Sequence, residues 1–87
     1  MYRNWRACCP REQQVLSYLA AGYGPKQIGY VLGLAHGTIS VYTGRLRKQL
    51  GAGCLHNLIV YAVVAVLTDG LPLPEGGTLP VMIPVAA

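Results

Sequence analysis

The chain of 87 residues is 53% hydrophobic and 11% charged, whereas an ordinary soluble domain has about 25% charged residues. This length allows one small domain and excludes a large enzyme with a deep pocket, and the low charge excludes a solvated disordered chain. Residues 1–51 hold all seven Lys and Arg residues and one acid, Glu12, whereas residues 52–87 hold two acids and no base. This distribution suggests that the first part faces a polyanion and that the apolar second part faces a protein partner.

The three cysteines, Cys8, Cys9 and Cys54, are an odd number and cannot form a closed set of disulfides. A reduced, cytoplasmic protein is therefore expected. Together with His36 and His56 the cysteines lack the C-x-x-C and H-x3–5-H spacings of zinc sites. We expect no metal and no cofactor.

The longest apolar run, residues 58–67, has ten residues and as a helix would span about 15 Å, which is half of the hydrocarbon core of a bilayer. No secretory signal with a cleavage site stands at the N-terminus. We expect no membrane span.

Residues 1–8 are expected to form an irregular arm whose Tyr2 and Trp5 pack on the body of the domain. A first helix should begin at Pro10, because proline suits the first helical position, and should end at Gly22. Its apolar positions have the spacing of an amphipathic helix; they are Val15, Leu16, Leu19 and Ala20.

A second, shorter helix should start at Gly24-Pro25 and stop at Gly33, and a third should follow over residues 37–50 after a very short linker. The residues expected on the inner face of the second helix are Ile28, Val31 and Leu32. Spacings of three and four define the inner stripe of the third helix, which is Ile39, Tyr42, Leu46 and Leu50.

A fourth helix is expected over residues 56–68. It is apolar nearly all round, so one face covers the other helices and the opposite face is left for a partner. Because many of its residues are β-branched, a strand over residues 59–66 is the competing prediction. Prolines make residues 70–87 an irregular tail, whose apolar end at 79–85 either docks or stays loose. The chain then divides into an arm (1–8), an all-α four-helix domain (9–69) and a Pro-rich tail (70–87).

A short helix, a tight corner at Gly33 and a longer helix with small and basic outer side chains form the pattern of a helix-turn-helix. The major groove of DNA admits one helix, which reads base edges with short polar and methyl groups while basic side chains meet phosphates. We therefore expect double-stranded DNA as the partner, bound by Lys26, Thr38, Ser40, Val41, Thr43, Arg45, Arg47 and Lys48.

Seven motifs follow one another over residues 8–62, and their spacing needs no insertion or deletion. They are Pro10-Arg11-Glu12, Val15-Leu16, Ala20-Ala21-Gly22, Pro25-Lys26-Gln27-Ile28-Gly29, Leu32-Gly33-Leu34, Gly37-Thr38-Ile39-Ser40-Val41-Tyr42 and Arg47-Lys48-Gln49-Leu50-Gly51. In this order they resemble the LuxR/GerE-type DNA-binding domain. The resemblance implies a small transcription regulator that dimerises through its last helix. This agrees with the surplus apolar face, for which the interface would be Leu58, Ile59, Tyr61, Ala62, Val63 and Val66.

The chain departs from the family pattern at positions that cap helices or bind DNA. Cys9 and Ala35 stand where the family has threonine and serine caps, and each loss costs about 1 kcal/mol. Ser40 replaces a lysine that commonly reads bases, and Gly44 occupies a further base-reading position. These departures imply a weak hold on DNA that needs a dimer or a helper. Because so few residues precede the domain, we expect a stand-alone regulator without a sensory domain in cis.

Two alternatives stay open. One is a protein-interaction adaptor that keeps the helix-turn-helix shape and inhibits another transcription regulator through its fourth helix and tail. The other is a promoter-reading domain of the sigma-factor kind, which shares the corner and the Pro10-Arg11-Glu12 opening. An enzyme is not expected, because the few acids and the two separated histidines supply no acid–base pair.

Overall fold

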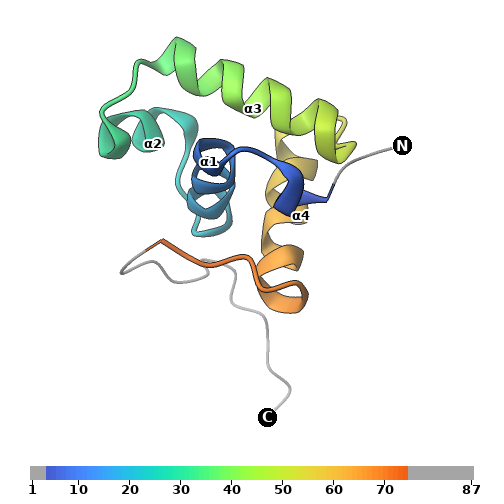
Figure 1. Cartoon of the computed structure of the whole chain (residues 1–87). Helices are drawn as coiled ribbons and strands as arrows, with labels where there is room; N and C mark the ends of the chain where they lie inside the picture. Colours follow the sequence, from blue (N-terminus) through green and yellow to red (C-terminus); the bar gives the residue numbers. More distant parts are fainter. Residues whose placement is uncertain (1–3, 75–87) are drawn as a thin grey trace.

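The fold is that of a computed structural model, which describes residues 4–74 (Figure 1). These residues form a short 3₁₀ turn, η1 (Trp5–Ala7), and four helices, α1 (Pro10–Ala20), α2 (Pro25–Leu32), α3 (His36–Leu50) and α4 (Leu55–Thr68). The all-α, four-helix prediction is confirmed, and each helix begins within one residue of its expected start. The alternative strand over residues 59–66 is wrong, because that segment lies within α4.

Local chemistry sets the start of α1. Pro10 occupies the first helical position, and the Glu12 carboxylate accepts a hydrogen bond from the backbone N–H of Cys9 at 3.2 Å. The second carboxylate oxygen of Glu12 accepts a hydrogen bond from Nε2 of Gln49 at 3.1 Å. Glu12 is therefore buried and joins α1 to α3.

The core lies around α1, with α2, α3 and α4 packed about it (Figure 1). Removing a large apolar side chain from water stabilises the fold by about 1.5–3 kcal/mol. The largest side chains that are fully buried are Leu16, Leu19, Ile28, Ile39, Leu46, Leu58 and Val15. These residues come from all four helices, so no helix can be displaced without exposing part of the core.

Val31 was expected to face the core, and this is wrong, since the residue is 49% exposed. The buried line of α2 follows Ile28 and Gly29, with Leu32 packed against the core at its edge. On a helix this leaves Val31 on the flank of α2.

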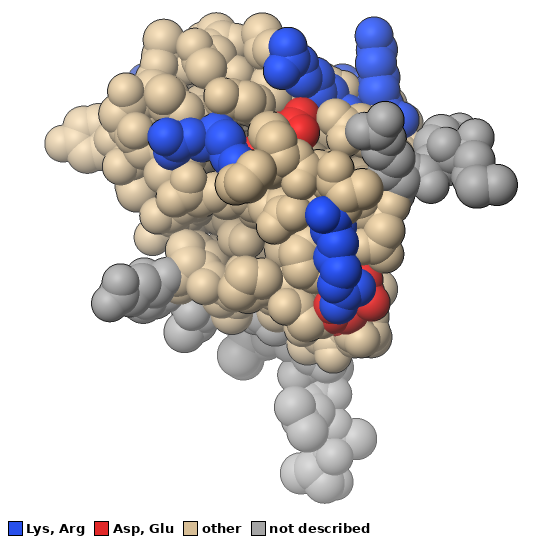
Figure 2. Space-filling model, viewed as in Figure 1, with Lys and Arg blue, Asp and Glu red and all other residues tan. Residues whose placement is uncertain are grey.

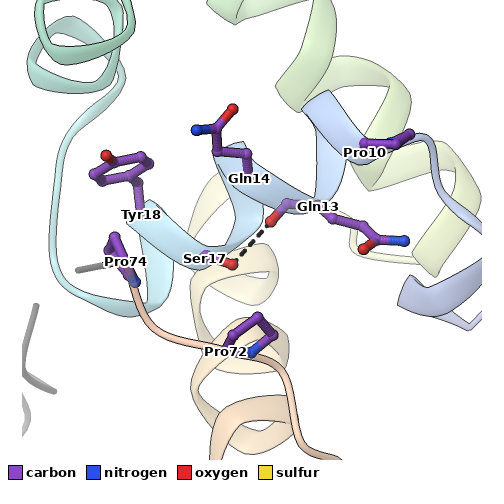
Figure 3. A pocket seen from close by; sticks show the side chains of 7 residues that line it. All are labelled: Pro10, Gln13, Gln14, Ser17, Tyr18, Pro72 and Pro74. Atoms are coloured by element: carbon purple, nitrogen blue, oxygen red, sulfur yellow. Dashed lines mark hydrogen bonds between the residues drawn. The ribbon is translucent and has the colours of Figure 1, made fainter.

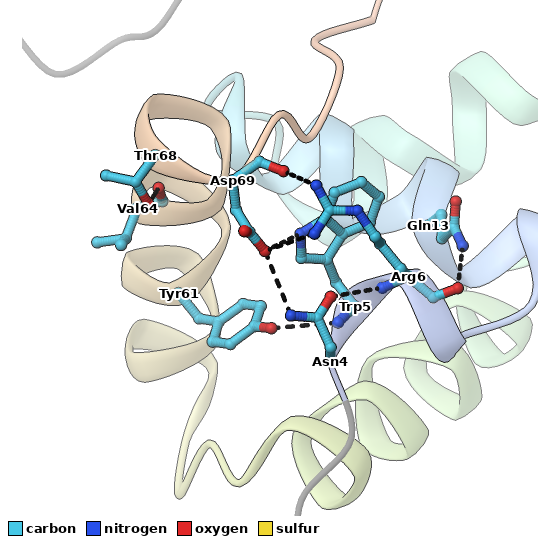
Figure 4. Close-up of polar contacts among 8 residues, drawn as sticks. All are labelled: Asn4, Trp5, Arg6, Gln13, Tyr61, Val64, Thr68 and Asp69. Carbon is cyan, nitrogen blue, oxygen red and sulfur yellow. Dashed lines mark hydrogen bonds and ion pairs between the residues drawn. The ribbon is translucent and has the colours of Figure 1, made fainter.

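Asp69, directly after α4, holds the N-terminal arm (Figure 4). Its carboxylate accepts hydrogen bonds from Trp5 Nε1 at 2.9 Å and from Asn4 Nδ2 at 3.3 Å, and it pairs with Arg6 at 3.1 Å. Arg6 also donates to the Asp69 carbonyl oxygen. The Trp5 backbone N–H donates to the Tyr61 hydroxyl at 3.2 Å. The prediction that Trp5 packs on the domain is confirmed, because its side chain is buried.

The chain after α4 runs back along α1, on the side away from α3 (Figure 1). Leu71 is buried, and its backbone N–H donates to the Ala65 carbonyl at 3.1 Å. Pro72 and Pro74 line a cleft of about 260 Å³ with α1, next to Tyr18 (Figure 3). The first residues of the expected tail thus pack on the domain. Tyr2 and the apolar segment 79–85 lie outside the described residues.

The arm and the end of α4 should separate in acid. Hydrogen bonds from Asn4, Arg6 and Trp5 hold the pKa of Asp69 below its ordinary value of 3.8. The folded state therefore favours the charged carboxylate. Its stabilising contribution is present above the ordinary pKa and is lost as the pH falls through the lowered one. Asp69→Asn should lower the melting temperature at neutral pH and flatten its decline in acid, as measured by circular dichroism. If the melting temperatures of Asp69→Asn and of the unaltered chain fell equally with pH in acid, the stabilising role assigned to the Asp69 carboxylate would be contradicted.

Candidate nucleic-acid interface

α2 and α3 meet at a tight corner. Gly33 has φ +68°, a left-handed conformation that side chains disfavour, and it ends α2. The Leu34 backbone N–H then donates to the Gly29 carbonyl at 2.8 Å. A Cβ atom on Gly29 would lie 2.8 Å from the Leu34 carbonyl oxygen, so the missing side chain lets the corner close against α2. The fully buried Ile39 fixes the first turn of α3 on the core.

α3 lies along the upper edge of the bundle, with one side on the core and the other uncovered (Figure 1). The buried side consists of Ile39, Thr43, Leu46 and Leu50. Gly37 and Gly44 are on α3 in open space, where an added Cβ would meet nothing within 4 Å. The exposed side chains of α3 are His36, Thr38, Ser40, Val41, Arg45, Arg47 and Lys48.

Seven of the eight residues expected to bind DNA are exposed, six on α3 and Lys26 on α2. Thr43 is the exception, and the expectation that it reads DNA is wrong. It is only 9% exposed, and its Oγ1 donates to the Ser40 carbonyl at 3.0 Å. The reason is its position, four residues after Ile39 and three before Leu46, which places it on the buried stripe. The role of the other seven in binding DNA stays a prediction.

The exposed side of α3 carries three basic side chains and no acid. The sequence contains no Asp or Glu between Glu12 and Asp69. Within residues 4–74 Arg6 forms an ion pair with Asp69, and the three basic residues of α3 form none. Figure 2 shows Lys and Arg side chains projecting from the upper edge of the molecule, where α3 lies. Such an unpaired cationic surface attracts a polyanion.

The three basic residues of α3 differ in their surroundings. Nη2 of Arg47 donates to the Gly53 carbonyl at 2.7 Å, so this side chain also holds the turn between α3 and α4. Arg45 and Lys48 make no hydrogen bond within the described part of the chain. These two are therefore the residues that report most cleanly on a ligand.

Other kinds of site find little support in residues 4–74. No group of three His, Cys, Asp or Glu side chains comes together there in a way that could hold a metal ion. In the same part of the chain, no single helix has both the length and the apolar character to cross a bilayer; α3 and α4 meet these criteria only together, across a bend of 70°. That the protein uses no metal or cofactor stays a prediction.

The structure corrects the set of α4 residues that was expected to form the dimer interface. Leu58 and Ala62 are fully buried in the core, so their assignment to an interface is wrong. The half-buried members of the expected set are Ile59, Tyr61, Val63 and Val66. The exposed large hydrophobic residues of α4 were not in that set; they are Val60, Val64 and Leu67. A helix that is apolar all round gives no periodic signal of which side faces inward, so only the packing could reveal this.

The short α2, the closed corner and the exposed basic α3 together define a helix-turn-helix protein of the DNA-binding kind. The chain belongs to the luxR family of bacterial regulatory proteins, whose model matches residues 9–62. This family consists of DNA-binding regulators and not of enzymes, and the resemblance found in the sequence is confirmed.

Among curated proteins the chain is similar to Nodulation protein W of Bradyrhizobium diazoefficiens, with 42% identity over 50 residues. The match covers 58% of this chain and 22% of that protein, so the chain spans little more than a fifth of its relative's length. No solved structure matches the chain.

Arg47→Ala should destabilise the domain, whereas Lys48→Ala should not. The arginine change removes its hydrogen bond to Gly53, a bond of a kind worth about 0.5–1.5 kcal/mol. Lys48 makes no such bond, and a surface change of this type stays within about 0.5 kcal/mol. Urea unfolding followed by circular dichroism measures both. Equal stabilities of the two variants would show that the Arg47 bond contributes nothing.

Proposed function

We propose that this protein regulates transcription by binding double-stranded DNA with α3 in the major groove. The observation that carries the proposal is the exposed side of α3, which has three basic side chains without ion pairs and no acid on α2, α3 or α4. A bacterial regulator that binds DNA works where the DNA is, and we therefore propose that this protein is cytoplasmic.

In this proposal the first half of α3 contacts base edges and the second half contacts phosphates. Thr38, Ser40 and Val41 lie in the first half of the helix, where hydroxyl and methyl groups meet base edges. Arg45, Arg47 and Lys48 lie in the second half and meet the phosphates beside the groove. Lys26, at the start of α2, meets a phosphate on the other side.

Base reading by this helix is weak, and the phosphates supply most of the affinity. Gly37 and Gly44 present no side chain to the groove, and Val41 between them offers only methyl groups. Binding to DNA of any sequence should therefore be readily detected, and it should depend strongly on salt.

Arg45→Ala and Lys48→Ala should each weaken binding to a mixed-sequence duplex of about 30 base pairs. Each change removes one phosphate contact, so the slope of log K against log salt should become less steep by about 0.9. Fluorescence anisotropy of a labelled duplex measures affinity and slope. The matched control is Arg11→Ala on α1, which removes the same charge from an exposed residue outside α3.

The proposed control should keep the slope of the unaltered chain. DNA binding through α3 would be refuted if the α3 variants and Arg11→Ala changed the slope equally, or if the unaltered chain bound no duplex at low salt.

We further propose that two copies associate through α4. The exposed residues Val60, Val64 and Leu67 follow one another at spacings of four and three, which places them along one side of the helix. Half-buried Ile59 and Val63 extend this apolar line. A two-fold dimer would set two α3 helices for successive turns of the major groove and would double the number of phosphate contacts.

Val64→Lys should convert a dimer into a monomer, because it places like charges against each other in a two-fold contact. Sedimentation velocity at micromolar concentration measures the association. Val31→Lys is the matched control, since Val31 on α2 is 49% exposed and Val64 is 51% exposed. A chain that is already monomeric without substitution, or a control that dissociates equally, would remove α4 as the interface.

A second candidate function is an adaptor that binds another transcription regulator through α4. Gly44, and a serine at position 40, favour it, because they leave the middle of α3 without a long polar side chain for base reading. The variants above separate the two functions. In an adaptor, Arg45→Ala and Lys48→Ala leave partner binding intact, and Val64→Lys abolishes it.

A further inference from the structure

The outer side of α2 carries a hollow that the DNA-binding proposal uses only at Lys26. Its volume is about 570 Å³, within the range of about 300–1,000 Å³ in which proteins bind small ligands and side chains. It is lined by Tyr23, Lys26, Gln27, Tyr30, Val31 and His36.

The walls of this hollow are apolar and partly rigid. Tyr30 is 90% exposed, the most of any large hydrophobic residue in the described part of the chain, and half of Val31 is exposed beside it. The ring of Tyr23 packs edge-to-face on the ring of Tyr18, with 5.0 Å between the ring centroids, and this contact restricts its movement. Exposed apolar groups gathered around a concavity mark a binding surface, and tyrosine is a frequent anchor of protein interfaces.

The rim of the hollow is cationic. Lys26 lines the hollow and forms no ion pair within residues 4–74. Because the sequence has no acid between Glu12 and Asp69, neither α2 nor α3 can supply a carboxylate to Lys26. An occupant that matches this surface has an apolar group for the floor and a negative charge for the rim.

We propose that the hollow on α2 binds a short acidic and apolar segment of a partner protein. One large apolar side chain of the partner packs between Tyr30 and Val31 against Tyr23, and a neighbouring carboxylate pairs with Lys26. A DNA backbone matches this surface less well, because phosphates satisfy Lys26 but leave Tyr30 and Val31 without an apolar partner. The proposal stands independently of DNA binding by α3.

The probes are two displayed peptide libraries of the same length. Both have two randomised apolar positions four residues apart; the flanking positions are Asp or Glu in one library and Lys or Arg in the other. Selection on the full chain should enrich the acidic library and not the basic one. The best acidic peptide, titrated in solution, should bind about tenfold more weakly to Tyr30→Ser and to Lys26→Glu, a loss typical of anchor residues.

Arg11→Glu, the same charge reversal at an exposed residue of α1 outside the hollow, is the control and should leave peptide binding unchanged. Val31→Ser provides a second variant on α2 in case Tyr30→Ser lowers the melting temperature.

Three results would overturn the proposal. They are equal enrichment of both libraries, a selected peptide that binds Tyr30→Ser and Val31→Ser as tightly as the unaltered chain, or the selection of no peptide at all. In the last case, loss of duplex binding in Tyr30→Ser and Val31→Ser would assign the hollow to the nucleic-acid surface. If the unaltered chain binds the acidic peptide but no DNA, the function proposed for α3 is refuted, whereas the proposal for the hollow on α2 still holds.

Discussion

The packing of α3 on the core decides which of its side chains are available to a ligand. Ile39, Leu46 and Leu50 hold the inner side of the helix, and the corner at Gly33 and Leu34 fixes its start against α2. Because side chains on a helix repeat every three to four residues, these anchors also determine that the basic residues point outward. Loosening the corner would turn α3 about its axis and would move every exposed side chain with it.

Charge adds a second constraint of the same kind. The one acid on α1, Glu12, is buried and is occupied by the backbone N–H of Cys9 and by Gln49. Asp69 is occupied by the arm and lies past the end of α4. Both acids among residues 4–74 thus hold the fold together, and neither forms an ion pair with a basic residue of α3. The exposed side of α3 is therefore basic although the chain has few charged residues, because both acids are engaged in contacts that hold the fold together.

The sequence predicted most of the fold, and its errors have common physical causes. Proline and glycine gave the helix ends correctly, because they act through the local backbone. Polarity misled at Thr43 and Val31, since a threonine can satisfy its hydroxyl on the preceding turn of its own helix and a valine can lie on an exposed flank. On α4 the apolar pattern carried no information about orientation, and Leu58 was therefore assigned to the wrong side. The contacts between Trp5 and Asp69 join residues 64 positions apart, which no local pattern reports.

The surfaces proposed for DNA, for a second copy and for a partner segment differ in whether they can be used together. The exposed line of α4 shares no residue with α3, so the proposed association through Val60 and Val64 and the proposed binding of DNA would reinforce each other. Two linked weak sites hold a duplex far better than one, because the second contact becomes intramolecular. The hollow on α2 shares Lys26 with the phosphate contacts. A carboxylate on Lys26 would take the place of a phosphate, and so a partner bound in the hollow would weaken the proposed contact with DNA, which the proposed dimer would strengthen.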